Sequence, residues 1–109
     1  KPTINIKLVH GFCFFISKTL ITTIGRFDCD QFPHYGGEDD YALKSIQYGF
    51  SNIIVGSVFV SHKGESSYSH ETRQKLVSQS LPELINRWGK KYIDECVSLS
   101  KNAQEILNK

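Results

Sequence analysis

The chain has 109 residues, of which 39% are hydrophobic and 22% are charged, and its formal net charge is +2. This length suits one small domain, and the net charge is too small to argue for nucleic-acid binding on electrostatics. No apolar run approaches the roughly 20 residues that a membrane helix needs. We therefore expect one domain, residues 1–109, without a nucleic-acid partner.

The three cysteines, Cys13, Cys29 and Cys96, do not have the spacing of metal ligands. Cys13 lies in the apolar run 12–16, which predicts a buried strand with a thiol in the core. Unpaired cysteines favour a reducing compartment. The chain starts at Lys1 and contains no Met, so we expect it to be a piece of a longer protein.

The first two thirds of the chain alternate short strands with helices. Ser17 is the predicted N-cap of a helix over 18–24, which Gly25 ends. A loop with many turn residues covers 27–37, and a second helix is predicted from about 38 to 48. The predicted strands are 7–9, 12–16, 53–55 and 58–60.

The last third is predicted to be helical. Ser80 and Glu83 have the spacing of a capping box, and Pro82 is tolerated in a first helical turn, so a helix is expected to start there. Another helix is predicted over 92–107, bent or broken near 98–100. The fold class is α/β: short strands that complete a mixed sheet, helices packed on it, and a helical carboxyl-terminal tail.

The segment Gly36-Gly37-Glu38-Asp39-Asp40 carries the most information about chemistry. The two glycines permit a close approach of backbone to a ligand. The acids open a helix, where the helix dipole favours their ionised forms, and an ionised carboxylate there can accept a proton from a bound hydroxyl group. A solvated acidic first turn is the alternative, and this segment alone favours it.

Two further side chains have both a functional and a structural interpretation. His62 follows the predicted strand 58–60 and precedes Gly64, so its imidazole can reach a Mn²⁺ or similar ion beyond the sheet. A hydrogen-bonded histidine at a strand end is the alternative. Trp88 is more typical of a core, although an exposed indole can stack on a sugar ring.

Several segments follow one another in a characteristic order. They are 11–17 (GFCFFIS), 24–28 (IGRFD), 32–41 (FPHYGGEDDY), 48–50 (YGF), 55–64 (VGSVFVSHKG) and 87–89 (RWG). In this order they resemble the carboxyl-terminal half of family 2 glycosyltransferases, which have the GT-A fold. The resemblance covers roughly residues 8–92.

The resemblance implies transfer of a sugar, with inversion, from a nucleoside-diphosphate sugar to a hydroxyl of a glycan or lipid-linked acceptor. Bacterial surface polysaccharide synthesis is the usual setting, in the cytoplasm or at the inner face of the membrane. The implied site residues are Asp39 as catalytic base with Asp40 in reserve, Gly37, Glu38 and Trp88 at the substrate, and His62 as a ligand of Mn²⁺ or Mg²⁺.

The amino-terminal half of the family, which binds the nucleotide and carries an Asp-x-Asp metal motif, has no counterpart in this chain. Asp28-Cys29-Asp30 has that spacing but falls in a later turn of the family pattern. We therefore expect this fragment to be inactive alone, to need the missing half for nucleotide and metal binding, and to self-associate. Two alternatives stay open: a non-catalytic acceptor-binding or interaction module that retains the half-fold, and a small metal- or nucleic-acid-binding domain.

Overall fold

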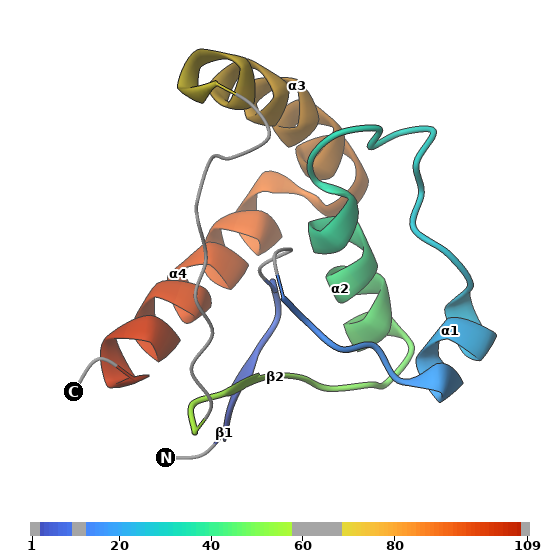
Figure 1. The fold of residues 1–109 in the computed structure, drawn as a ribbon, viewed down its shortest axis with the longest axis vertical. Coiled ribbons are helices and arrows are strands. Elements are labelled where there is room, and N and C mark those ends of the chain that lie inside the picture. Colours follow the sequence, from blue (N-terminus) through green and yellow to red (C-terminus); the bar gives the residue numbers. More distant parts are fainter. Residues whose placement is uncertain (1–2, 10–12, 58–68, 108–109) are drawn as a thin grey trace.

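The computed structural model describes residues 3–9, 13–57 and 69–107 (Figure 1). The predicted mixture of helices and strands is confirmed at the level of α/β composition. In chain order the elements are β1 (Thr3–Ile6), α1 (Lys18–Ile24), α2 (Gly37–Gln47), β2 (Asn52–Val55), α3 (His70–Trp88) and α4 (Lys90–Leu107).

The two strands form an antiparallel sheet in which Ile4 lies opposite Ile54. β1 also contacts α4, and β2 contacts α2. Ile6 is buried against the helices, whereas Ile53 and Val55 on the other face of the sheet are 48% and 47% exposed. The mixed sheet that the resemblance implies is therefore not what the described strands form.

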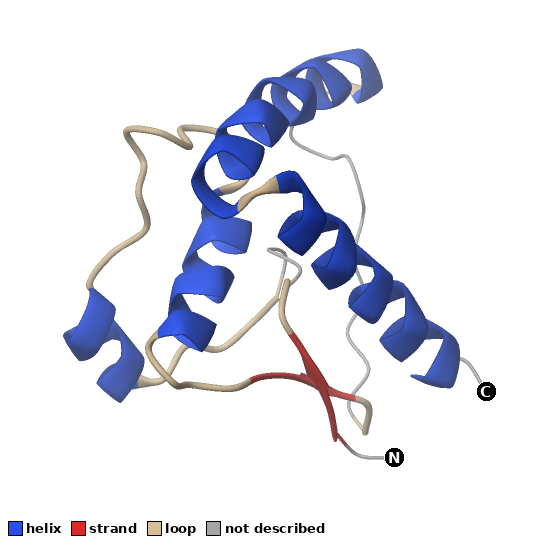
Figure 2. Ribbon diagram, turned by 180° about the vertical axis from the view of Figure 1, so that it is seen from behind, coloured by secondary structure: helices blue, strands red, loops and turns tan. Residues whose placement is uncertain are grey.

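Asn52 joins β2 to its neighbours through hydrogen bonds. Its Nδ2 donates to the carbonyl oxygens of Lys7 and Ala42, each at 2.9 Å, and its Oδ1 accepts from Ser45 Oγ at 3.1 Å. One amide thus ties the sheet to α2. Figures 1 and 2 both show α2 between α4 and the small outlying helix α1.

Helix α1 begins and ends at the predicted caps. Ser17 Oγ accepts a hydrogen bond from Leu20 N at 3.0 Å, and Gly25 follows the helix with a φ of 83°. The side chain of Tyr41 fixes this end to α2, because its hydroxyl donates to the Gly25 carbonyl at 2.7 Å.

Helix α2 begins within one residue of its predicted start, after a glycine that no other residue could replace without strain. Gly36 has a φ of 87°, and a Cβ built on it would lie 2.8 Å from Phe32 Cδ1 and 3.1 Å from Ser80 Cβ. Gly49, with a φ of 88°, follows the other end of the helix, as predicted.

The core lies where α2, α3 and α4 meet. Its buried members are Phe32, Leu43, Leu84, Ile93 and Cys96, and Trp88 and Tyr92 are among the partly buried side chains packed against it. Removing most of the fully buried Leu43 side chain would cost about 2–5 kcal/mol of stability, as is usual for such truncations. This core therefore fixes the start of α2 relative to the end of α3.

The predicted start of the helix before Gly89 and the predicted break in the last helix are wrong, whereas the predicted end of the last helix at Leu107 is confirmed. α3 begins at His70 with Ser69 as its N-cap, so Ser80 and Pro82 lie inside the helix. Ser80 Oγ donates back to the Val77 carbonyl at 2.8 Å instead of capping a helix. Figure 2 shows α4 as one continuous helix, without the predicted break at 98–100. The reason is its inner face: Ile93, Cys96 and Ala103 are buried at helical spacing on both sides of Ser100.

The prediction for the amino-terminal strands is also wrong. The first strand ends at Ile6, before residues 7–9, and residues 13–17 form no regular element. Cys13 is exposed, and Phe15 is 101% exposed. Phe14 instead stacks on Phe27, with ring centroids 6.3 Å apart. The predicted strand 58–60 lies outside the described residues.

Candidate functional site

The first turn of α2 presents Glu38, Asp39 and Asp40. This turn starts close to the ring of Phe27: a Cβ added to Gly37 would lie 3.4 Å from Phe27 Cδ2. The backbone N–H of Asp40 donates to the Gly36 carbonyl at 2.9 Å, which closes the turn. Because successive residues of an α-helix are rotated by about 100° around its axis, the three acidic side chains point in different directions.

Asp40 is buried and fully engaged by the end of α3. Its side chain is 1% exposed, and Trp88 Nε1 donates to Oδ1 at 2.9 Å. Arg87 Nη1 donates to Oδ2 at 3.1 Å, and Lys44 Nζ lies 3.7 Å from the same oxygen. A buried carboxylate held by two cations and an indole N–H acts as a structural group, since both of its oxygens already have partners.

Arg87 holds a second carboxylate with the same nitrogen. Its Nη1 lies 2.9 Å from Asp28 Oδ2, and its guanidinium lies over the Phe32 ring, 5.4 Å from the centroid. The pKa of Asp28 is lowered by the hydrogen bond from the Gln31 backbone N–H and by Arg87. We call the contacts of Arg87 with Asp28 and Asp40 the Arg87 bridge.

Asp39 has the opposite environment. Its side chain is half-buried and makes no hydrogen bond or ion pair with the residues that the structure describes. Burial, followed by the charge of Glu38, raises the pKa of Asp39 to about 7. A carboxyl whose pKa lies near neutral pH can both take up and release a proton there, which is what general acid–base catalysis requires.

The structure brings together five of the six predicted site residues. Gly37, Glu38, Asp39 and Asp40 form the first turn of α2, and Trp88 meets that turn by donating to Asp40. The Trp88 ring packs against the core and lies 6.4 Å, between centroids, from the tilted Tyr92 ring. Its contact with a substrate stays a prediction. His62, the predicted metal ligand, lies outside the described residues.

Asp28 and Arg87 were not predicted to belong to the site. Arg87 appeared only as part of a family motif, and Asp28 as a turn residue. Arg87 is 47 positions from Asp40 along the chain, and no local pattern links the two. In the sequence, Arg87 and Trp88 at the end of a helix would have indicated only weakly that they contact a buried carboxylate far away along the chain.

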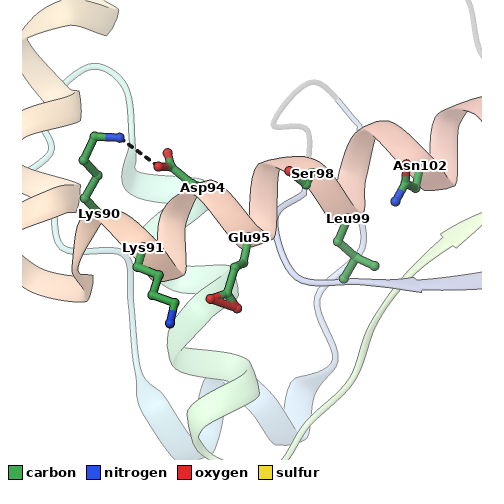
Figure 3. A pocket seen from close by; sticks show the side chains of 7 residues that line it. All are labelled: Lys90, Lys91, Asp94, Glu95, Ser98, Leu99 and Asn102. Carbon is green, nitrogen blue, oxygen red and sulfur yellow. Dashed lines mark hydrogen bonds and ion pairs between the residues drawn. The ribbon is translucent and has the colours of Figure 1, made fainter.

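Two hollows lie near these elements, and neither is lined by Asp39. The larger, about 790 Å³, runs along the outer face of α4 (Figure 3). Lys90 and Asp94, which line it, form an ion pair of 2.8 Å. The smaller, about 40 Å³, lies between α3 and the loop before Gly36, and has room for about one or two water molecules.

The resemblance implies a divalent ion bound together with the nucleotide-binding half of the enzyme, and its predicted ligand His62 lies outside the described residues. Nowhere among residues 3–9, 13–57 and 69–107 do three or more His, Cys, Asp or Glu side chains come together as a metal site. Asp40 and Asp28 are already paired with Arg87.

No known protein family, curated protein or solved structure matches the chain. Among the described helices, none combines the length and the apolar character needed to cross a membrane.

Proposed function

We propose that this chain is the acceptor-side, carboxyl-terminal part of an inverting glycosyltransferase, in which Asp39 is the general base. One observation carries the proposal: two adjacent carboxyls in one helical turn have opposite environments. Asp40 is buried among Arg87, Lys44 and Trp88, whereas Asp39 has no such partner within the described part of the chain, and burial followed by the charge of Glu38 raises its pKa to about 7. Active sites commonly separate the roles of neighbouring acids in this way.

In the proposed reaction, Asp39 accepts the proton of an acceptor hydroxyl. The hydroxyl oxygen forms a bond to the anomeric carbon of the donor sugar from the face opposite the nucleoside diphosphate. The bond from that carbon to the diphosphate oxygen breaks, so the configuration inverts and the diphosphate leaves with the electron pair. Asp39 then gives its proton to water. General-base catalysis of this kind contributes about 10²–10⁴-fold to a rate.

The other residues of the turn have supporting roles in this proposal. Glu38 helps to keep the pKa of Asp39 near neutral, because its charge opposes a second charge beside it. Asp40 acts as the anchor between α2 and α3 and not as the reserve base, since both of its oxygens are engaged. In this proposal the nucleotide and the divalent ion bind together with an amino-terminal half of the enzyme, and His62 of this chain stays the predicted ligand of that ion.

The test uses the complete enzyme, single-turnover transfer from labelled nucleoside-diphosphate sugars, and the variant Asp39→Asn. This variant keeps the shape of the side chain and removes the proton acceptor, so we expect transfer to slow by about 10²–10⁴-fold. The wild-type rate should rise with pH through an apparent pKa near 7, the value for Asp39, and the variant should lose this limb.

The control is Asp94→Asn, which removes an exposed carboxylate on α4 and should leave the rate unchanged. An Asp39→Asn enzyme with the wild-type rate would contradict the proposed base. Glycan binding without any transfer by the wild-type enzyme would instead favour a non-catalytic acceptor-binding module.

A further inference from the structure

The Arg87 bridge joins three segments of the chain at a single nitrogen atom. Nη1 lies 2.9 Å from Asp28 Oδ2, in the loop before α2, and 3.1 Å from Asp40 Oδ2, in the first turn of α2. Arg87 itself lies in the last turn of α3. An arginine shared between two carboxylates fixes the relative positions of all three segments.

The loop between the two carboxylates is packed beneath the guanidinium. The backbone N–H of Phe32 donates to the Asp28 carbonyl at 3.0 Å, and the Phe32 ring lies under Arg87 and directly against Gly36. The Arg87 bridge therefore holds the start of this loop through Asp28, and it holds the first turn of the helix that follows the loop through Asp40. Asp39 precedes Asp40 in the same turn, so its direction depends on how that turn is held.

We propose that Arg87 is a positioning residue for Asp39: by holding Asp28 and Asp40 together, it fixes the first turn of α2 in the orientation that buries the Asp39 carboxyl. The catalytic consequence of this role rests on the proposed function, but the positioning can be measured without it. Glu38 is the charged group that acts on Asp39 directly. Lys44 is the other charged group at Asp40.

Removal of Arg87 separates positioning from a simple charge effect, because the two change the Asp39 pKa in opposite directions. Loss of a nearby positive charge favours the protonated carboxyl and would raise the pKa. Loss of positioning lets water reach the carboxyl, which removes the desolvation that raises the pKa and so lowers it. A role in stability alone would leave the pKa of the folded protein unchanged.

The experiment is an NMR titration of the 109-residue chain with ¹³C-labelled aspartate carboxyls, in which Asp39→Asn assigns the Asp39 signal. In the variant Arg87→Gln we expect the Asp39 pKa to fall by about one unit or more, towards that of a solvated aspartate. The matched control is Lys90→Gln, which removes the same charge from an exposed pair with Asp94 and should leave the Asp39 pKa unchanged.

A second variant, Arg87→Lys, keeps the positive charge and lacks the planar guanidinium, so any change in the Asp39 pKa reports geometry. We expect a smaller fall than in Arg87→Gln, and this variant decides the question where Arg87→Gln does not fold. An Asp39 pKa that is unchanged or raised in the folded variants would overturn the positioning role. That result would leave the proposed base intact. A lowered Asp39 pKa in Arg87→Gln, together with a complete wild-type enzyme that shows no transfer, would overturn the proposed function alone.

Discussion

The junction of α2 with α3 and the outer face of α4 contain similar charged pairs in different surroundings. At the junction, Arg87 contacts Asp40, whose side chain is 1% exposed. On α4, Lys90 lies only three positions after Arg87 and contacts Asp94, and the side chains of this pair are 72% and 63% exposed (Figure 3). The shorter contact is the exposed one, at 2.8 Å against 3.1 Å.

From this difference we expect the burial of Asp40, and not the length of the ion pair, to determine what each pair contributes to stability. An exposed pair between adjacent turns of a helix typically contributes about 0.3–0.5 kcal/mol. Removing one member of a buried pair costs more, because the remaining charge and its hydrogen-bonding groups lose their partners out of water. The junction also holds two adjacent carboxyls in opposite environments, since Asp40 is paired and buried and the pKa of Asp39 is raised to about 7.

The first expected effect on stability concerns Gly36, where the junction is most tightly packed against a glycine. Gly36→Ala forces a side chain into a left-handed conformation and places its Cβ 2.8 Å from the Phe32 ring. We expect a loss of about 2–4 kcal/mol, the sum of the backbone strain and the overpacking. Urea unfolding followed by circular dichroism measures the loss.

The control for this variant is Gly49→Ala at the open end of α2. Gly49 has a similar φ of 88°, but an added Cβ meets nothing within 4 Å. It should lose about 1–2 kcal/mol from the backbone conformation alone. Equal losses in the two variants would show that the contacts of Gly36 with the aromatic loop do not matter to the fold.

A smaller effect is expected from the buried acid. Asp40→Asn preserves the size of the side chain and an oxygen for Trp88 Nε1, but it removes the charge that faces Arg87 and Lys44. We expect a loss of about 1–3 kcal/mol, since the polar atoms that remain lie out of water with poorer partners. Asp94→Asn should change stability by less than about 0.5 kcal/mol. Comparable losses in both variants would mean that water reaches the junction as freely as it reaches α4.

The sequence predicted the parts of this comparison that depend on local residues. The caps at Ser17 and Gly25, the glycine before α2 and the acids in its first turn are local signals, and the structure confirms them. The predicted start of α3 near Ser80 is wrong, because the hydroxyl of Ser69 accepts a hydrogen bond from Thr72 N and caps the helix there, so that Ser80 lies inside it.

The contrast between Asp39 and Asp40 could not be predicted from the sequence. Neighbouring aspartates in a helix have the same local pattern, and their environments differ through Arg87 and Trp88, which lie 47 and 48 positions away from Asp40. The buried strand at 12–16 failed for the same kind of reason. Its Phe14 finds a partner in Phe27 across a loop and not in a sheet, and Phe15 is exposed.

The last expected difference is in the pH dependence of stability, and it concerns Asp39. Because its folded pKa is raised to about 7 from an ordinary value of 3.8, the folded state holds a proton between these pH values that the unfolded state has released. Stability should therefore fall as pH rises across this window, by an amount on the order of 1 kcal/mol per pH unit, and level off above it.

The measurement is the difference in unfolding free energy between the wild-type chain and Asp39→Asn, taken from urea titrations across the same pH window. Asparagine does not titrate, so the wild type should lose stability relative to the variant as pH rises from about 4 to about 7. Asp94→Asn is the matched control, because it removes a carboxylate from an exposed ion pair on α4. A flat difference for Asp39→Asn would show that its carboxyl is solvated, and the contrast with Asp40 would then lie only in the partners of Asp40.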